Sequence, residues 1–289
     1  MDRSPLIELP FRIENASGDT IRGDLRHPEG ASDLPILIIC HGFTAHKDWG
    51  PFPHIGRRFA SEGFASIVIN FSHNGVGADS RRFNEPEKFA RNTIGKELED
   101  LRALTGALTG GRLGSGVVNP ARIGILGHSR GGGVAILAAR EIRPIGGVAT
   151  WSSVSTFRRY TDHQRQIWER EGYLPVTIRG MRTKLRFDLS ILRDLETHAE
   201  RYDLPKAVAE LKVPLLLVHG AADVSVKPAE AETLKRAADP ARSELVMLEG
   251  EGHMFGAGHP FRAERSSIDR VIDLTAGWFH RNLSQRSTA

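Results

Sequence analysis

The sharpest chemical signal in the sequence is a serine enclosed by small residues. Positions 127–131 read Gly-His-Ser-Arg-Gly, a G-x-S-x-G pattern, with an apolar run before it and a glycine- and alanine-rich stretch after it. A strand, a serine and then a helix are typical of a nucleophile elbow, which lifts the hydroxyl above the edge of a sheet. We therefore predict that Ser129 is a nucleophile. The alternative is a serine that only caps the following helix.

A serine hydroxyl is a weak nucleophile until a general base takes its proton. The predicted base is His253, which stands in a glycine-rich loop, Glu-Gly-Glu-Gly-His, after the last apolar run. His259 is the nearest rival, six residues further on. A solvent-exposed loop histidine is the alternative interpretation of His253, and it would leave Ser129 without a base.

The histidine needs an acid that fixes its tautomer and stabilises the imidazolium. Asp223 follows the apolar run 213–219, so it is expected at the carboxyl end of a buried strand, where open α/β sheets hold their sites. The alternative is that Asp223 caps a helix beginning near Pro228. Asp203 and Asp239 stand in less suitable surroundings.

Acyl transfer also requires two N–H donors for the negative oxygen that forms on the substrate. One is expected from Arg130, directly after the nucleophile. The other is expected from Phe43, in the His-Gly-Phe-Thr loop that follows the apolar run 35–40. An ordinary turn at the end of a strand is the alternative for this loop.

Four motifs, HGF, GHSRGG, HGAAD and GEGH, make the chain resemble the α/β-hydrolase superfamily over nearly its whole length. Within it the chain resembles serine esterases of the dienelactone-hydrolase and prolyl-oligopeptidase-related group, and the cinnamoyl and feruloyl esterases are similar in layout. The resemblance implies acyl transfer to Ser129, with Asp223 and His253 completing the triad. It also implies an eight-stranded sheet whose second strand is antiparallel. Those dienelactone hydrolases use a cysteine nucleophile, whereas this chain has serine.

The elements around these residues alternate between β-rich runs and helical stretches, which predicts an α/β fold with a mostly parallel sheet and helices on both faces. The predicted strands are 7–14, 20–27, 35–40, 64–71, 122–127, 145–150, 213–219 and 244–248. The first two are expected to pair antiparallel at the sheet edge. The predicted helices include 52–62, 86–109, 131–143 and 268–282, and the second is weakened by Gly95 and Gly106.

Residues 151–211 interrupt the alternation. They show two plausible helices, 158–170 and 189–209, and no strand character, which predicts a helical cap inserted into a core of residues 1–150 and 212–289. Trp151, Tyr160 and Trp168 are candidate pocket residues, and the alternative is a small core of the cap itself. The first half of this segment is basic, and we interpret it as a solvated surface. The alternative is a surface that attracts anionic or carboxylate-bearing substrates. Its cations are Arg158, Arg159, Arg165, Arg170, Arg179, Arg182, Lys184 and Arg186.

Composition narrows the possible classes of protein and of site further. The 289 residues are 40% apolar and 26% charged, which is ordinary for a globular protein. Cys40 is the one cysteine and ends an apolar run, so we expect a core residue, no disulfide framework and no cysteine-based metal site. No metal-binding spacing and no phosphate-binding loop were found, and we expect no metal and no cofactor.

The net charge of +4 is mild, so nucleic acid is not expected as a partner. No stretch approaches the roughly 20 apolar residues that span a bilayer, and no secretory signal opens the sequence, which leads us to expect a cytoplasmic protein without a membrane partner. The sequence leaves the oligomeric state open, a homodimer included.

These features predict a cofactor-independent serine hydrolase that cleaves small-molecule carboxylic esters, with short-chain, aryl or cinnamoyl esters as candidates. A peptidase or amidase and a perhydrolase are alternatives on the same scaffold, because function depends on the pocket. A non-catalytic binding protein is the alternative from another class. Such a protein would have no need of an acid and a base placed in this order.

Overall fold

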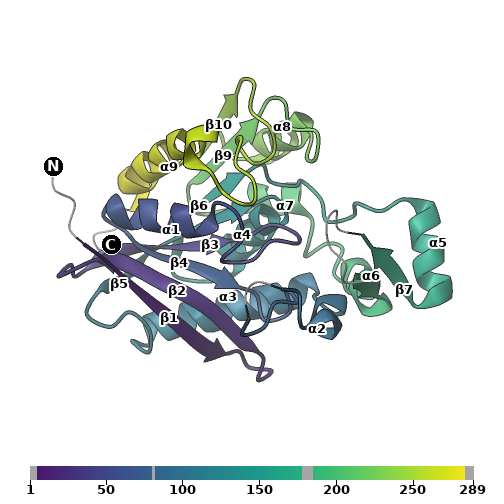
Figure 1. Ribbon diagram of the computed structural model, residues 1–289. Helices are drawn as coiled ribbons and strands as arrows, with labels where there is room; N and C mark the ends of the chain where they lie inside the picture. Colours follow the sequence, from purple (N-terminus) through teal and green to yellow (C-terminus); the bar gives the residue numbers. More distant parts are fainter. Residues whose placement is uncertain (1–4, 80–81, 178–184, 284–289) are drawn as a thin grey trace.

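The computed structural model describes residues 5–79, 82–177 and 185–283 of the chain. Eight strands form one sheet in the order β1-β2-β4-β3-β5-β6-β9-β10 (Figure 1). β2 runs antiparallel to both of its neighbours, and the other pairings are parallel. The predicted eight-stranded, mostly parallel sheet is confirmed. Its strands are β1 (Leu6–Glu14), β2 (Thr20–Pro28), β3 (Leu34–Cys40), β4 (Ala65–Asn70), β5 (Val118–His128), β6 (Ile145–Trp151), β9 (Leu215–Gly220) and β10 (Ser243–Leu248).

Helices cover both faces of the sheet (Figure 1). One face lies under α1 (Phe52–Ser61) and α9 (Ile268–Leu283), and the other lies under α3 (Ile94–Thr109), α4 (Arg130–Glu141) and α8 (Pro228–Ala237). A short 3-10 helix, Ala263–Arg265, precedes α9. The central strands are apolar on both faces because each face is buried under helices. This rigid core fixes the strand ends from which the candidate site residues project.

The predicted helix 86–109 is two helices. α2 (Pro86–Ala90) ends first, and α3 then begins behind Thr93, whose side chain accepts a hydrogen bond from the N–H of Lys96. A threonine in this position caps a helix because it satisfies a backbone donor that has no partner within the helix. Gly95 and Gly106 lie inside α3 and do not interrupt it.

The insertion, residues 151–211, contains two strands where the sequence predicted none, and that prediction is wrong. β7 (Tyr173–Val176) pairs antiparallel with β8 (Leu185–Asp188). These strands escape a sequence reading because each has four residues and one side is exposed. The helices of the insertion are α5 (Asp162–Glu171), α6 (Leu189–Thr197) and α7 (Leu204–Ala209).

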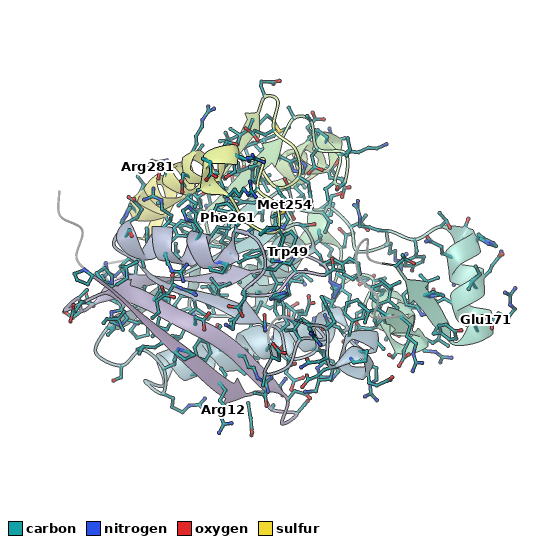
Figure 2. All side chains as sticks on the ribbon, in the orientation of Figure 1. Arg12, Trp49, Glu171, Met254, Phe261 and Arg281 are labelled. Carbon is teal, nitrogen blue, oxygen red and sulfur yellow. The ribbon has the colours of Figure 1, made fainter. Side chains whose placement is uncertain are left out.

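The insertion leaves the sheet at the end of β6 and returns at β9. α5, β7 and α6 project away from the sheet, and Glu171 marks their outer end (Figure 2). α7 instead packs against α4 and α8 on the sheet. The projecting part therefore stands beside the carboxyl ends of the parallel strands, where Ser129 emerges from β5.

Candidate active site

Ser129 occupies a strained turn between β5 and α4. Its backbone has φ 55° and ψ −121°, a region that residues with a side chain rarely adopt. A Cβ on Gly127 would overlap the backbone of Gly131, and a Cβ on Gly131 would overlap the carbonyl group of His41. The flanking positions of the G-x-S-x-G pattern therefore require glycine, and the turn pushes the serine side chain out of the sheet.

The structure brings together the three residues predicted as a triad. His253 Nε2 lies 3.0 Å from Ser129 Oγ, and His253 Nδ1 lies 2.7 Å from Asp223 Oδ2. Asp223 and His253 come from the loops after β9 and β10. When Nδ1–H donates to the carboxylate, Nε2 is left unprotonated and can accept the serine proton. The geometry is that of a nucleophile, a base and an orienting acid.

Asp223 is held as a carboxylate in a buried position. Its Oδ1 accepts hydrogen bonds from the N–H groups of Ser225 (2.8 Å) and Val226 (2.9 Å). Burial by itself would raise the pKa of Asp223, but the hydrogen bonds from Val226, His253 and Ser225 outweigh it and hold the pKa below its ordinary value. The acid therefore stays ionised at neutral pH.

The two predicted oxyanion donors flank the serine. Phe43 lies in the loop after β3, and Arg130 is the first residue of α4. The loop approaches closely, because a Cβ on Gly42 would lie 3.1 Å from the Cβ of Ser129. The N-terminus of α4 carries a partial positive charge directed at this point. These features suit the binding of a developing negative oxygen.

The guanidinium of Arg130 is tied to α3. It contacts the carboxylate of Glu97 at 3.2 Å, and Glu97 also accepts a hydrogen bond from Asn92 at 2.8 Å. Burial raises the pKa of Glu97, although the charge of Arg130 opposes that shift. The pair joins α4, which follows Ser129, to the first turn of α3.

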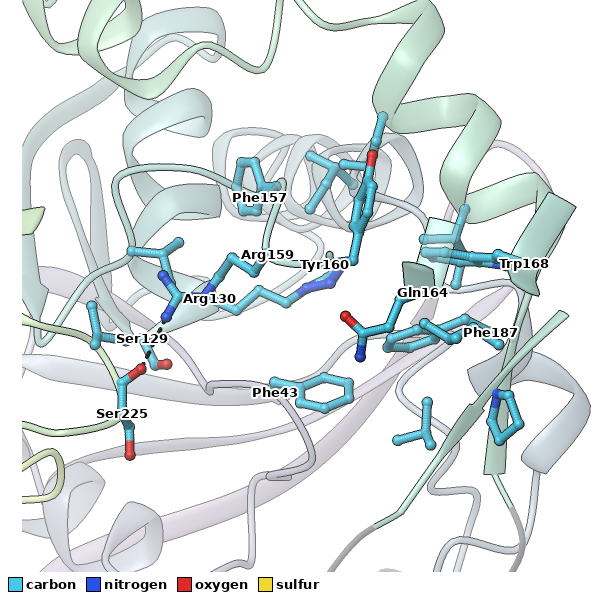
Figure 3. A pocket seen from close by; sticks show the side chains of 18 of the residues that line it. Phe43, Ser129, Arg130, Phe157, Arg159, Tyr160, Gln164, Trp168, Phe187 and Ser225 are labelled. Atoms are coloured by element: carbon cyan, nitrogen blue, oxygen red, sulfur yellow. Dashed lines mark hydrogen bonds between the residues drawn. The ribbon is translucent and has the colours of Figure 1, made fainter. Parts of the chain in front are cut away.

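A cavity of about 510 Å³ opens beside Ser129 and His253. Its walls are mainly apolar and come from the loop that carries Phe43, from the insertion, and from Ile94 of α3 and Val226 after β9. They include two of the predicted pocket residues, Tyr160 and Trp168. Figure 3 shows Ser129 at one end of the cavity and the rings of Trp168 and Phe187 at the other, with Gln164 reaching in between. The other aromatic walls are Phe43 and Phe157.

Trp151, the third predicted pocket residue, does not line this cavity, and the prediction is corrected. Its ring is buried on the opposite face of the sheet, where it stacks on Phe59 (6.3 Å) and meets Phe255 edge-on (6.1 Å). Its indole N–H donates to the hydroxyl of Thr275 at 2.9 Å. Side chains alternate between the two faces along a strand, and Trp151 falls on the α1 and α9 face.

Phe187, Arg159 and Gln164 are among the cavity residues that the sequence reasoning did not place in the pocket. Phe187 lies on β8, a strand that was not predicted. Arg159 pairs with Glu230 and donates to the carbonyl oxygen of Ser225 at 2.9 Å. Gln164 belongs to a capping box in which Thr161 N–H donates to its side-chain oxygen at 2.8 Å. The Thr-x-x-Gln spacing of that box is the one signal the sequence offered.

The rival residues have other roles. His259 accepts a hydrogen bond from the N–H of Gly50 (3.1 Å) and stacks on Trp49. Asp203 caps α7 by accepting from the N–H of Lys206. Of the basic residues noted in the insertion, Arg179, Arg182 and Lys184 lie outside the described residues.

Across residues 5–79, 82–177 and 185–283, no group of three or more His, Cys, Asp or Glu side chains could hold a metal ion. In the same parts of the chain, no helix has both the length and the apolar character needed to cross a membrane. Cys40 is buried at the end of β3, and burial, followed by the charge of Glu97, raises the pKa of its thiol. The buried thiol is therefore protonated and stands apart from the candidate chemistry.

Comparison with known proteins identifies one family and many solved structures with a similar fold. The sequence profile of the prolyl oligopeptidase family matches residues 52–286. No curated protein matches the chain. Among solved structures, the esterase domain of a Rhodothermus marinus protein has a TM-score of 0.63 and 22% identity, covering 96% of this chain and 99% of that one.

Two further structures show the same fold. Est1E from Butyrivibrio proteoclasticus, solved with ferulic acid, has a TM-score of 0.68 and 20% identity, covering 95% of this chain and 100% of that one. A dienelactone hydrolase from Klebsiella pneumoniae has a TM-score of 0.63 and 19% identity, covering 96% of this chain and 100% of that one. Because these identities are low, the likeness shows a shared fold, the α/β-hydrolase fold, and nothing finer.

Proposed function

The chain belongs to the prolyl oligopeptidase family of hydrolases, and from this premise we propose that it is a serine esterase acting on small carboxylic esters. One observation carries the proposal. Ser129, His253 and Asp223 form a continuous hydrogen-bonded chain, with distances of 3.0 and 2.7 Å, at the end of a largely apolar cavity. This arrangement can activate a serine hydroxyl against a carbonyl group.

The proposed reaction has two halves. In the first, His253 Nε2 takes the proton of Ser129 while Oγ attacks the ester carbonyl, and the N–H groups of Phe43 and Arg130 bind the resulting oxyanion. The intermediate collapses when His253 returns the proton to the departing alcohol, which leaves an acyl group on Ser129. In the second half, His253 takes a proton from water as the water attacks the acyl group, and then returns it to Oγ as the acid departs. Asp223 stabilises the imidazolium throughout.

The cavity walls favour a substrate with an apolar or aromatic group. Phe43, Tyr160, Trp168 and Phe187 contribute rings, and such surfaces bind flat or apolar groups by burying them. The ferulic acid in the Butyrivibrio proteoclasticus structure suggests feruloyl esters as test substrates beside short-chain esters. We propose that the natural ester places this group in the cavity.

A peptidase is the second candidate, because the family takes its description from prolyl oligopeptidases. An enzyme that cuts after the first residues of a peptide commonly needs a carboxylate to hold the substrate amine. Among the described residues that line the cavity, none is Asp or Glu, and the cationic side chains are Arg130 and Arg159. This lining favours the esterase.

The test compares esters with amides. We expect wild-type protein to hydrolyse p-nitrophenyl acetate, p-nitrophenyl butyrate or methyl ferulate, and to leave the matching p-nitroanilides nearly untouched. Ser129→Ala should lower kcat by about 10⁴-fold or more while the fold is retained. Comparable cleavage of the anilides would favour the peptidase. Ester turnover that survives in Ser129→Ala would refute the proposed site.

A further inference from the structure

His128 stands where the turn that carries Ser129 meets two loops of the candidate site, those of Phe43 and His253. It is the last residue of β5, directly before Ser129, and its side chain is buried. Its ring lies on the α1 face of the sheet and meets Phe52 of α1 edge-on at 6.4 Å. Neither the triad nor the oxyanion hole uses this residue.

The imidazole of His128 holds the loop of the proposed base. Its Nε2 lies 3.0 Å from the main-chain carbonyl oxygen of His253, and the two rings are 4.7 Å apart. A carbonyl oxygen can only accept, so Nε2 must carry the proton and donate. Burial, and then the neighbouring His253, lowers the pKa of His128 to about 3. The ring is therefore neutral in the working range and keeps this donor role.

The same ring also backs the oxyanion loop. A Cβ on Gly42 would lie 2.9 Å from His128 Nδ1, so the loop that carries Phe43 passes directly over the imidazole. One buried side chain thus touches the base loop and the oxyanion loop, and its own backbone leads into the nucleophile. Atoms in catalytic groups must be placed to within fractions of an ångström, and such contacts supply that placement.

We propose that His128 is a positioning residue. By donating to the main-chain carbonyl of His253, it fixes His253 relative to Ser129. The inference rests on the proposed function. His253 is then held at three points: Asp223 binds Nδ1 of its ring, Ser129 meets Nε2, and His128 binds its main-chain carbonyl. Without the third point the histidine loop can shift, and the 3.0 Å contact between Nε2 and Oγ lengthens.

A pair of variants of similar length separates the hydrogen bond from the packing. His128→Gln keeps an N–H donor, whereas His128→Met fills similar space without one. We expect His128→Met to lower kcat about 10- to 100-fold with KM changed less than threefold, and His128→Gln to recover part of the loss. Equal kcat values for wild type and His128→Met, in folded protein, would overturn the proposal.

The matched control is His27, another buried histidine whose ring nitrogen contacts a backbone carbonyl, that of Pro28, at 2.9 Å, on β2. His27→Met should leave kcat within twofold of wild type. A loss as large as that of His128→Met would show a general effect of replacing buried histidines and would also overturn the proposal. Thermal unfolding of each variant verifies that it is folded.

Labelling of Ser129 by a fluorophosphonate probe makes the test independent of the ester used. Wild-type protein should be labelled, and His128→Met should be labelled 10- to 100-fold more slowly, with His128→Gln in between. If wild type is not labelled, the proposed function fails. If wild type is labelled and His128→Met is labelled at the same rate, the function stands and only the role of His128 fails. Should His128→Met not fold, His128→Phe, which keeps a ring and lacks a donor, takes its place in both assays.

Discussion

The two carboxylate oxygens of Asp223 have different partners. Oδ1 receives two backbone N–H groups from its own loop, and Oδ2 receives His253 Nδ1–H at 2.7 Å. The two backbone bonds keep the carboxylate in place and ionised, and the bond from Nδ1–H would set the tautomer of His253, the proposed base. An asparagine at this position would keep the shape of the side chain. Its NH₂ group would, however, face either the backbone N–H groups or His253 Nδ1–H, and neither can accept a hydrogen bond from it.

We therefore expect Asp223→Asn to lower kcat by about 10³- to 10⁴-fold, because the wrong tautomer of His253 would face Ser129. Steady-state hydrolysis of a p-nitrophenyl ester measures the effect. Asp203→Asn, which changes a helix cap on α7, is the control and should leave kcat close to wild type. A mild effect of Asp223→Asn would indicate that another acid serves the histidine.

At the scale of elements, the sheet positions the proposed catalytic residues, and the insertion forms much of the cavity. β5, β9 and β10 end in the loops of the proposed triad, while α5, β8 and the segment before α5 supply much of the cavity wall. Trp151 and Trp168 illustrate the division, because both are buried tryptophans but they lie in different surroundings. Trp151 packs between the sheet and α9, whereas Trp168 stacks on Phe187 at 5.7 Å beside the cavity.

This contrast gives a paired prediction. Trp151→Ala should destabilise the fold by about 3–5 kcal/mol, because it empties core volume and leaves Thr275 without its indole partner. Trp168→Ala should instead change the ratio of kcat/KM values between aryl and acetyl esters by about tenfold or more, since it removes a cavity wall. Urea unfolding and ester profiles measure the two effects. An ester profile of Trp168→Ala that matches wild type would place that ring in the core as well.

Ser129 could be predicted from the sequence because the strained turn requires glycine at positions 127 and 131, and an apolar strand precedes it while a helix follows it. The same holds for the apolar strands β3 and β9, whose burial on both faces leaves an uninterrupted apolar run. Other features depend on tertiary contacts and left little trace in the sequence. β7 and β8 are too short to show a period, and the direction of Trp151 depends on a strand end that was predicted one residue earlier.

At the scale of the whole molecule, one buried carboxylate joins three distant segments. Asp100 of α3 accepts hydrogen bonds from the side chain of Asn15 after β1 (2.8 Å) and from the N–H of Ser72 after β4 (2.7 Å). Burial raises the pKa of Asp100 to about 7, against the opposing effect of these hydrogen bonds. The edge hairpin, a central strand and a covering helix thus meet at a group that titrates near neutral pH.

The sign of the pH effect follows from that pKa. Between about pH 4 and pH 7 the folded chain holds a proton on Asp100 that the unfolded chain releases, so the free energy of unfolding should fall as the pH rises through this window. We expect a decrease on the order of 2 kcal/mol between pH 5 and pH 8 from this group. Urea unfolding at both pH values measures it. Asp100→Asn should flatten the slope, and an unchanged slope in that variant would assign the pH dependence elsewhere.

The backbone of Ser129 has a consequence for heat tolerance. A residue with a side chain at φ 55° and ψ −121° costs about 1–3 kcal/mol, and only glycine adopts that conformation freely. Ser129→Gly should therefore melt a few degrees above wild type, while Ser129→Ala, which keeps the Cβ, should not. The chain would then carry a strained backbone at a residue on which its proposed reactivity depends. Selection for heat stability alone would favour glycine at position 129, and the proposed nucleophile would be lost.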